Sequence, residues 1–563
     1  MVGNKTAGRP LKTILLWAII LVAANVILFR YYMRLDLTAD KRYTLSGTTR
    51  SLLAQLDQPL VVTVFLDGDL STDIKRLQVA AKDLLDEYRA RSGGKLQVTF
   101  VDPLAEVSGE AAEKVYTDLM EAGLEATNLN IRRSEGVLQK IIFPGALVSY
   151  KGKQLPVNFL GTHFQTRSSA ESIHYATENL EHQFTSVIEK LLNRERVKIG
   201  FLTGHGELSG RRIVDITGTL NQTYEVKQIE LREEPLSNLN EYATLILAKP
   251  RDSFSEDEKY KLDQYLMQGG NLLIFADQFN ASLDSMRTAG NMLALPLDLK
   301  LDDLFFKYGF RINYDLLRDM NCAPIPVVLE TGGQGNQQLM PWVYFPLVFS
   351  RSQHPLVRHI DPVRMEFVSS IDTIATEGIR KTILLSTSPY TQKAKGPVYL
   401  SLDAIHDAAD PAAFNAGETP VAVLLEGEFT SAFQHRGRAR FDQSVPFLEK
   451  GKTARIIVVA DGDVPANDIS AIDNSYFPLG FDKYTRQTFG NKTFVSNCVD
   501  YLSGRSAILE LRRREMGMRM LDRARAAAEG TRWKLINMIF PVALVLLFSF
   551  VYNLLRRQKY GRS

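Results

Sequence analysis

The sequence predicts an α/β protein between two membrane-spanning helices, and three observations indicate this. An uncharged apolar stretch near each end of the chain approaches the roughly 20 residues that a helix needs to cross a bilayer. Between these stretches, apolar runs of strand-favouring residues alternate with segments of helical periodicity. One run, Val197–Leu202, stops at Thr203-Gly204-His205-Gly206 and is followed by a helical pattern. That order is the strand–loop–helix unit of a parallel sheet.

The composition is typical of a globular protein. The chain has 563 residues, enough for three or four domains, of which 45% are hydrophobic and 23% are charged. Its net charge of +3 is too small to indicate nucleic-acid binding by itself. The two cysteines, Cys322 and Cys498, exclude a disulfide-dense scaffold and a four-cysteine metal site. Whether these two cysteines are bridged or free stays open.

The first apolar stretch, Ile14–Phe29, continues through Tyr31-Tyr32. We expect a transmembrane helix over residues 14–33, preceded by a tail of residues 1–13. The basic residues before it would also suit a signal peptide, but bulky and charged residues stand where a cleavage site would need small ones. An uncleaved anchor is therefore favoured.

The second apolar stretch, Leu535–Leu555, predicts a transmembrane helix over residues 533–555, followed by a basic tail of residues 556–563. The aromatic residues expected at the membrane interface are Trp17, Tyr31, Tyr32, Trp533 and Tyr552. Two spans would place both termini on one side of the membrane and the intervening residues on the other. Because Lys and Arg flank both sides of each span, charge alone does not decide the orientation.

Residues 36–165 are expected to form a small domain with the element order β-α-β-α-β-β. Its strands and helices are predicted at Leu60–Leu66, Ile74–Arg89, Leu96–Val101 and Ala111–Ala122, followed by a hairpin of Leu138–Phe143 with Ala146–Tyr150. This order predicts a thioredoxin-like α/β domain. The redox chemistry of that fold requires Cys-x-x-Cys, and the segment contains no cysteine. The sequence therefore excludes redox activity of this kind.

A linking helix over residues 170–195 is expected to lead to a second domain over residues 196–504. Its core strands are predicted at 197–202, 224–231, 244–248, 271–276 and 454–460, with helices between them. This alternation predicts a doubly wound sheet of the flavodoxin or amidotransferase type. We also expect a β-rich insertion at about 311–440 and an Arg-rich juxtamembrane stem over residues 505–532.

The loop Gly204-His205-Gly206-Glu207 is the first candidate site, because ligands of parallel sheets meet the carboxyl ends of the strands. Its glycines would let the backbone approach a ligand closely, and His205 with Glu207 would suit a metal ion or a proton transfer. Two ligands are too few for zinc, which takes three or four from the protein. A tight turn, whose polar side chains satisfy the backbone, therefore remains the alternative.

The second candidate is Asp461-Gly462-Asp463, which follows the last core strand and would attract a cation or serve as a turn. Two familiar catalytic motifs are missing. Gly451-Lys452-Thr453 resembles the end of a P-loop, but Pro446 stands where the motif needs glycine. No Gly-x-Ser-x-Gly elbow occurs. We expect no catalytic residue, no resident metal and no cofactor, and treat both loops as a candidate partner surface.

Several short motifs resemble those of the GldG family, the gliding-motility-associated auxiliary subunits of ABC transporters. The resemblance covers nearly the whole chain and is carried by Arg42–Ser46, Phe65–Asp69, Gly200–Leu208, Lys261–Gly270, Trp342–Leu347 with His354-Pro355, Val421–Phe429, Asp461–Asp463 and Trp533–Tyr560. Singly these motifs are weak. Their order between two apolar stretches makes them more specific.

This resemblance implies a non-enzymatic subunit in the cytoplasmic membrane that works with a separate permease and a separate ATPase. It also implies that the large domains are periplasmic, where they would bind protein or polymer partners such as envelope or gliding proteins. The central sheet is similar to the module of intraflagellar transport proteins, which would favour protein binding over chemistry. Two alternatives stay open: an extracytoplasmic hydrolase or metal-dependent enzyme using Gly204–Glu207, and a structural scaffold of the envelope or gliding machinery.

Overall fold

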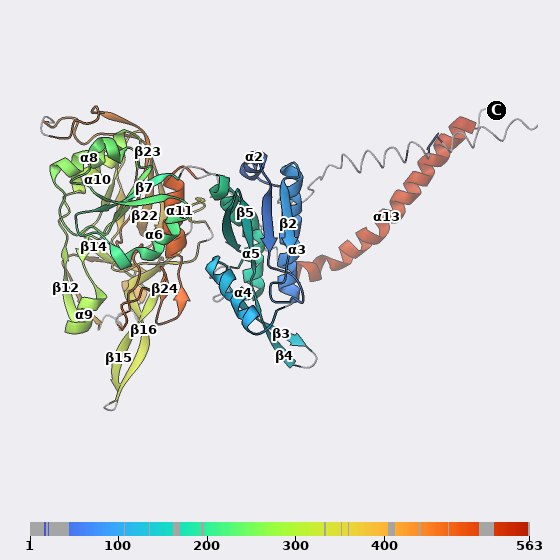
Figure 1. The fold of residues 1–563 in the computed structure, drawn as a ribbon, viewed down its shortest axis with the longest axis horizontal. Coiled ribbons are helices and arrows are strands. Elements are labelled where there is room, and N and C mark those ends of the chain that lie inside the picture. The colour runs from blue at the N-terminus through green and yellow to red at the C-terminus, as the bar shows by residue number, and fades with distance from the viewer. Residues whose placement is uncertain are drawn as a thin grey trace, which may run out of the picture. The chain divides into compact units, whose positions relative to one another are not determined.

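The protein is described here in a computed structural model (Figure 1). The described residues are 16–17, 21, 44–105, 107–133, 136–160, 169–192, 196–331, 334–350, 352–358, 360–402, 411–437, 441–470, 472–505 and 523–560. They fall into two compact units, residues 1–514 and 515–563. Most of the first expected span, residues 14–33 with Tyr31 and Tyr32, lies outside the described residues. Within it, Leu16, Trp17 and Leu21 are helical and exposed.

The N-terminal domain contains a four-stranded sheet in the order β2-β1-β5-β6. Its strands are β1 (Leu60–Val64), β2 (Leu96–Phe100), β5 (Gly145–Tyr150) and β6 (Lys153–Asn158). Strands β1 and β2 are parallel, whereas β5 runs antiparallel to both β1 and β6. Alternate residues of the central strand β5 are buried on opposite faces, as a strand covered on both sides requires.

Helices cover both faces of this sheet. The helices are α2 (Gly47–Ala54), α3 (Thr72–Arg91), α4 (Glu110–Glu121) and α5 (Ser169–Leu192). Helix α3 begins at the N-cap Ser71, whose side chain accepts from Ile74 N–H, and it buries one apolar face against α5 and the sheet. Helix α4 packs with Phe143 and Leu147 in a separate, smaller core.

The expected hairpin of Leu138–Phe143 with Ala146–Tyr150 is replaced by two other pairings. Strand β4 (Gly136–Ile142) pairs with β3 (Thr127–Arg133), and β5 pairs with β1 and β6. The chain turns between β4 and β5, where Gly145 N–H donates to the Phe143 carbonyl oxygen at 2.7 Å. Because β5 is apolar on both faces, a central place in the sheet buries more of it than a hairpin would.

The central domain contains a seven-stranded sheet in the order β19-β22-β23-β10-β9-β7-β8. Its five parallel strands are β7 (Lys198–Thr203), β8 (Glu225–Glu230), β9 (Thr244–Ala248), β10 (Asn271–Phe275) and β23 (Lys450–Val459). Strands β19 (Ile379–Ser386) and β22 (Pro420–Thr430) extend the sheet with antiparallel pairings. Part of the segment expected as an insertion therefore belongs to the main sheet, because β22 lies directly beside β23.

Helices α8 and α10 lie on one side of this sheet, and α6 and α11 on the other (Figure 1). The helices of the domain are α6 (Val214–Asn221), α7 (Leu236–Leu239), α8 (Glu256–Met267), α9 (Leu283–Ala289), α10 (Asp302–Tyr308) and α11 (Asn491–Leu502). Helix α8 starts at a capping box in which Ser255 accepts from Glu258 N–H and the Glu258 carboxylate accepts from Ser255 N–H.

The remaining strands form small sheets, several of which surround a second core that includes Phe279, Trp342 and Phe345. They are β11 (Phe279–Asn280), β12 (Asn291–Pro296), β13 (Phe310–Ile312), β14 (Asp315–Asp319), β15 (Cys322–Thr331), β16 (Gln334–Val348), β17 (Val363–Arg364), β18 (Ile371–Thr373), β20 (Thr391–Lys395), β21 (Val398–Ser401), β24 (Phe481–Asp482) and β25 (Gln487–Thr488). The hairpin of β15 and β16 extends beyond the body of the domain (Figure 1).

The second unit contains the helix α13 (Arg523–Tyr560). Its segment Lys534–Arg557 is long and apolar enough to cross a membrane, and its side chains are exposed, including Tyr552. The predicted second span therefore has a helix of suitable length. Pro541 lies inside this helix. Most of the expected stem, residues 506–522, lies outside the described residues.

Candidate functional site

Both sequence-predicted loops lie at the carboxyl edge of the parallel strands. Gly204–Glu207 follows β7, and Asp461–Asp463 follows β23. The loop after β9 lies between them, because Arg251 N–H and Asp252 N–H donate to the His205 carbonyl oxygen at 2.7 and 3.0 Å. The same loop begins with Lys249, whose side chain reaches the acidic loop. The fold thus brings the two loops to one edge, where they form two separate clusters.

The His205 cluster is enclosed. Only 2% of His205 is exposed, and its ring stacks on Phe254 with the ring centroids 3.7 Å apart. The Nδ1 atom lies 3.3 Å from the Glu207 carboxylate, and Nε2 lies 3.3 Å from the carboxylate of Glu258. Glu207 also accepts from His205 N–H at 2.6 Å, which closes the loop on itself. Gly204 and Gly206 have φ values of +114° and +71°, which glycine adopts without strain.

Two opposing effects set the protonation of this histidine. Burial alone would lower the pKa of His205, but the interactions with Glu207 and Glu258 outweigh it and raise the pKa. Burial likewise opposes ionisation of Glu258, while the hydrogen bonds from Ser255 and the charge of His205 lower its pKa. The geometry therefore favours an imidazolium between two carboxylates. The helix cap of α8 supplies one of them.

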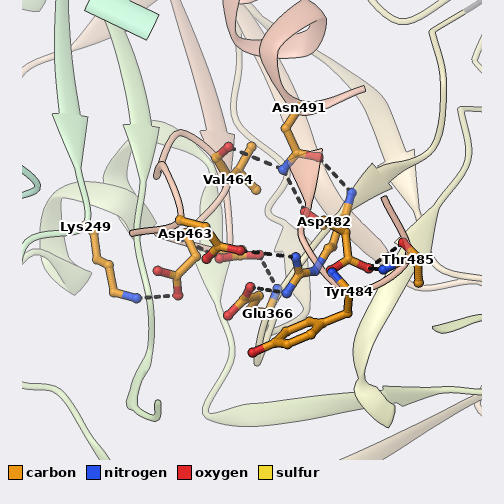
Figure 2. A network of polar contacts seen from close by, with 11 residues as sticks. Lys249, Glu366, Asp463, Val464, Asp482, Tyr484, Thr485 and Asn491 are labelled. Atoms are coloured by element: carbon orange, nitrogen blue, oxygen red, sulfur yellow. Dashed lines mark hydrogen bonds and ion pairs between the residues drawn. The ribbon is translucent and has the colours of Figure 1, made fainter. Parts of the chain in front are cut away.

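The Lys249 cluster is built from three chain segments. The Lys249 Nζ atom lies 3.1 Å from the Asp277 carboxylate, which follows β10, and it also contacts Asp463. Gly462 N–H donates to Asp277 at 2.6 Å, and Asp463 N–H donates to Asp461 at 2.7 Å. Figure 2 shows Lys249 pointing toward Asp463 from the side of β9. Backbone donors and one ammonium group thus satisfy three neighbouring carboxylates.

Burial and mutual repulsion govern the charges in this cluster. Burial raises the pKa of Asp277, and burial together with the charges of Asp463 and Asp277 raises the pKa of Asp461. Burial would lower the pKa of Lys249, but the charges of Asp277 and Asp463 outweigh it and raise the pKa. The ammonium group is therefore held in its charged form.

Oxygen atoms of Asp277, Asp461 and Asp463 lie within 4.8 Å of one another, a spacing that suits a small cation. However, the Lys249 ammonium group already lies among these carboxylates. It supplies the positive charge that a metal ion would otherwise provide. The cluster fits an internal ion-pair network better than a metal site.

A second layer of polar groups surrounds Asp461 and Asp463 (Figure 2). Glu366 N–H donates to Asp461 at 2.7 Å, and the Glu366 carboxylate pairs with Arg364 at 2.8 Å. Burial raises the pKa of Glu366 to about 7, although Arg364 acts in the opposite direction. Asn491 binds the backbone of Arg364 through both a donor and an acceptor, which fixes this layer against α11.

The P-loop-like sequence and the two cysteines offer no catalytic site of their own. Gly451-Lys452-Thr453 lies within strand β23 rather than before a helix. Cys498 is buried in α11, and burial raises its pKa well above the usual value. Burial also raises the pKa of Cys322 to about 12. Both cysteines are free. Neither thiol has the lowered pKa of a reactive cysteine.

Four members of these clusters were not predicted from the sequence: Lys249, Asp277, Glu258 and Glu366. Lys249 and Asp277 each come directly after a predicted strand, at 244–248 and 271–276. Because loops after parallel strands meet at one edge of the sheet, this rule would have indicated both residues. Glu258 stands in the acidic first turn of α8 after Ser255, and such a pattern indicates a helix start but not a contact with His205. Glu366 lies in an irregular segment, and no local pattern indicates its position.

Three comparisons with known proteins bear on this chain. A family model described as "ABC-type uncharacterized transport system", with the short name ABC_transp_aux, matches residues 196–498, and a model of a domain of unknown function, DUF7088, matches residues 39–149. An uncharacterized protein of Borreliella burgdorferi strain B31 is 20% identical over 430 residues, which cover 75% of this chain and 78% of that protein.

Two solved structures are similar at low scores. The mmIFT52 N-terminal domain has a TM-score of 0.31 and 14% identity, with 55% of this chain and 97% of that chain covered. The exo-β-1,4-mannosidase Op5Man5 from Opitutaceae bacterium strain TAV5 has a TM-score of 0.20 and 12% identity, with 84% of this chain and 55% of that chain covered.

Because the transport-system model matches more than half of the chain, the protein belongs to that family of ABC transport auxiliary proteins.

Proposed function

We propose that this protein is a membrane-anchored, non-catalytic accessory subunit of an ABC transporter of the gliding-motility type. Its large domains would bind protein or polymer partners and follow the conformational cycle of a separate permease and ATPase. Membership of the auxiliary family supports the transport role. The proposal that the subunit is non-catalytic rests on the enclosure of charged groups at the carboxyl edge. There, His205 is only 2% exposed and Lys249 lies among three carboxylates.

This enclosure matters because doubly wound enzymes use the carboxyl edge for their ligands. A general acid or base must come within hydrogen-bond distance of the group it protonates or deprotonates. His205 and Glu207 instead interact with each other and with Glu258, under the ring of Phe254. A hydrolase or metal-dependent enzyme at this loop would require the cluster to open. A static scaffold of the envelope or gliding machinery, which needs no nucleotide cycle, is the third candidate function.

The anchoring and orientation belong to the same proposal. We propose a two-pass protein of the cytoplasmic membrane with spans at residues 14–33 and 533–555 and with periplasmic domains. The helix Lys534–Arg557 supports the second span. We also propose a thioredoxin-like N-terminal domain and a flavodoxin-like central domain; the strand orders β2-β1-β5-β6 and β8-β7-β9-β10-β23 support them.

Affinity purification of the tagged full-length protein in detergent, followed by mass spectrometry, tests the transporter role. We expect recovery of an ATPase with a complete P-loop and of a multi-span permease. An unrelated two-span membrane protein with the same tag is the control. Recovery of neither partner, in a detergent that preserves other ABC complexes, would contradict the proposal.

The purified complex also separates a binder from an enzyme. Replacing His205 by Gln should leave the partners bound, since the cluster is enclosed in the central domain. The enzyme alternative is favoured instead under two conditions. The wild-type subunit must catalyse a reaction without its partners, and the His205→Gln variant must lose this activity while still binding them.

A further inference from the structure

A basic cavity of about 340 Å³ lies apart from the carboxyl edge, within the first compact unit. Its wall is formed by α5 and β6, by the residues just before β7, by the turn after α6 and by Arg505 after α11. Among the described residues that line it, four carry a positive charge and none carries a negative one. These four are Lys153, Lys190, Arg196 and Arg505.

The charge of Arg505 is compensated inside the protein. Its Nε atom donates to the Glu189 carboxylate at 2.7 Å, and its Nη1 atom lies 3.4 Å from Asp500. Tyr224, whose hydroxyl donates to Asp500 at 2.6 Å, lies beside it. Arg505 and Tyr224 are buried and form the rigid inner part of the cavity. The excess positive charge must come from the other three side chains.

Lys190 is the partly buried member of these three. Within the part of the chain that the structure describes, its ammonium group makes no ion pair or hydrogen bond. Burial lowers the pKa of Lys190; Asp500 acts against this shift, while Arg505 reinforces it by repulsion. An ammonium group removed from water without a partner costs free energy, so an anion in the cavity would stabilise it.

Lys153 and Arg196 are exposed at the rim. Arg196 donates to the Asn221 carbonyl oxygen at 3.1 Å, a neutral acceptor, and among the described residues it makes no ion pair, although its charge also lowers the pKa of Glu225. Three cations around one cavity match a multiply charged oxyanion better than a single carboxylate, because a phosphate group carries a charge of about −1.5 to −2 at neutral pH and offers several acceptor oxygens.

We propose that this cavity binds the phosphate or diphosphate group of a ligand, with Lys190 at depth and Arg196 and Lys153 at the rim. Such a ligand would contact the N-terminal domain through Lys190 and Lys153 and the central domain through Arg196. The proposal does not depend on the transporter partners, and its failure would leave the proposed function unaffected.

Isothermal titration of the full-length protein in detergent with inorganic pyrophosphate tests this site, with chloride at equal ionic strength as the blank. We expect saturable binding. Replacing Lys190 by Met should reduce the affinity about tenfold or more, since a hydrogen bond to a charged group is lost. Lys82→Met, an exposed change on α3 outside the cavity, should leave the affinity unchanged. Absence of saturable binding, or equal affinity in Lys190→Met, would overturn the proposal.

Two further measurements keep the test decisive. Arg196→Met changes an exposed side chain and should preserve the fold while weakening pyrophosphate binding, so it tests the rim of the cavity independently of Lys190. Without anion, Lys190→Met should be at least as stable as the wild type, because it removes an unpaired ammonium group; clear destabilisation would argue against the site. If a short-chain phosphatidic acid displaces pyrophosphate, the ligand is a lipid headgroup. If it does not, the ligand is a soluble phosphate compound.

Discussion

The two clusters at the carboxyl edge of the central sheet enclose their charges in different ways. Most of the His205 cluster is local: the histidine and Glu207 stand two residues apart, and Glu258 belongs to the capping box at the start of helix α8. The Lys249 cluster joins loops that follow three different strands, together with Glu366. Its cation is a lysine whose pKa the neighbouring carboxylates raise, whereas the cation of the other cluster is a histidine whose pKa Glu207 and Glu258 raise.

This difference separates the roles of the two clusters. A lysine among carboxylates neutralises charge at all physiological pH values, so it acts as a permanent part of the core. A histidine between two carboxylates responds to pH, so its contribution to stability is conditional. Trp342 is fully buried and is the only tryptophan between the two expected spans, so its fluorescence reports unfolding of the central domain.

The largest expected effect comes from Lys249→Met. The variant leaves Asp277, Asp461 and Asp463 without their counter-charge, which should lower the free energy of unfolding by about 3–5 kcal/mol. Urea unfolding followed by Trp342 fluorescence measures it. Lys307→Met, an exposed change on α10, is the control and should stay within about 0.5 kcal/mol of the wild type. If Lys249→Met lowers the free energy of unfolding no more than the control does, the ammonium group does not hold the cluster together.

His205→Gln should have the next largest effect. The amide keeps some hydrogen bonding but removes the positive charge and the ring that stacks on Phe254, at an expected cost of about 2 kcal/mol near pH 6. The same urea titration applies. The exposed residue His435 offers the matched control, His435→Gln, for which we expect little change. Equal stability of both variants would mean that His205 is not paired as described.

Gly462→Ala compares the packing of the two clusters. An added Cβ would lie 2.5 Å from Lys249 Cγ and 2.7 Å from its Cβ, so the lysine must shift, at a cost of about 1–3 kcal/mol. In the other cluster, Gly204→Ala meets no atom closer than 3.5 Å and bears only the strain of its φ of +114°, about 1 kcal/mol. Thermal unfolding measures both variants, and Gly462→Ala should lower the unfolding temperature more than Gly204→Ala. The reverse order would contradict the packing difference.

The smallest effect concerns pH. Because the folded-state pKa of His205 is raised, its stabilisation is fully present below the unfolded value of about 6.5 and is lost as the pH rises through the folded pKa. The stability difference between wild type and His205→Gln should therefore be larger at pH 6 than at pH 9. The difference for Lys249→Met should change less, and urea midpoints at both pH values measure this. A His205 difference that grows with pH would reverse the sign of the inferred shift.

Sequence patterns were most informative where the structure depends on near neighbours. Apolar runs such as Thr244–Ala248 and Asn271–Phe275 became strands β9 and β10. Ser255 followed by three acidic residues is a typical helix start, and α8 begins there; the uncharged stretch before Arg556 lies within α13. Each depends on periodicity, capping or length, which a few adjacent residues determine.

Pairings between distant segments depended on the tertiary structure. The sequence by itself determined core strands such as β7, β9 and β10, the apolar part of α13 and the positions of the two candidate loops, with His205 two residues before Glu207. Only the fold decided that β5 pairs with β1 rather than β4, that β22 joins the main sheet, and that Lys249 meets Asp277 and Asp463. The reason is physical: local propensity acts over a few residues, whereas burial and charge neutralisation are properties of whatever surfaces the folded chain brings together.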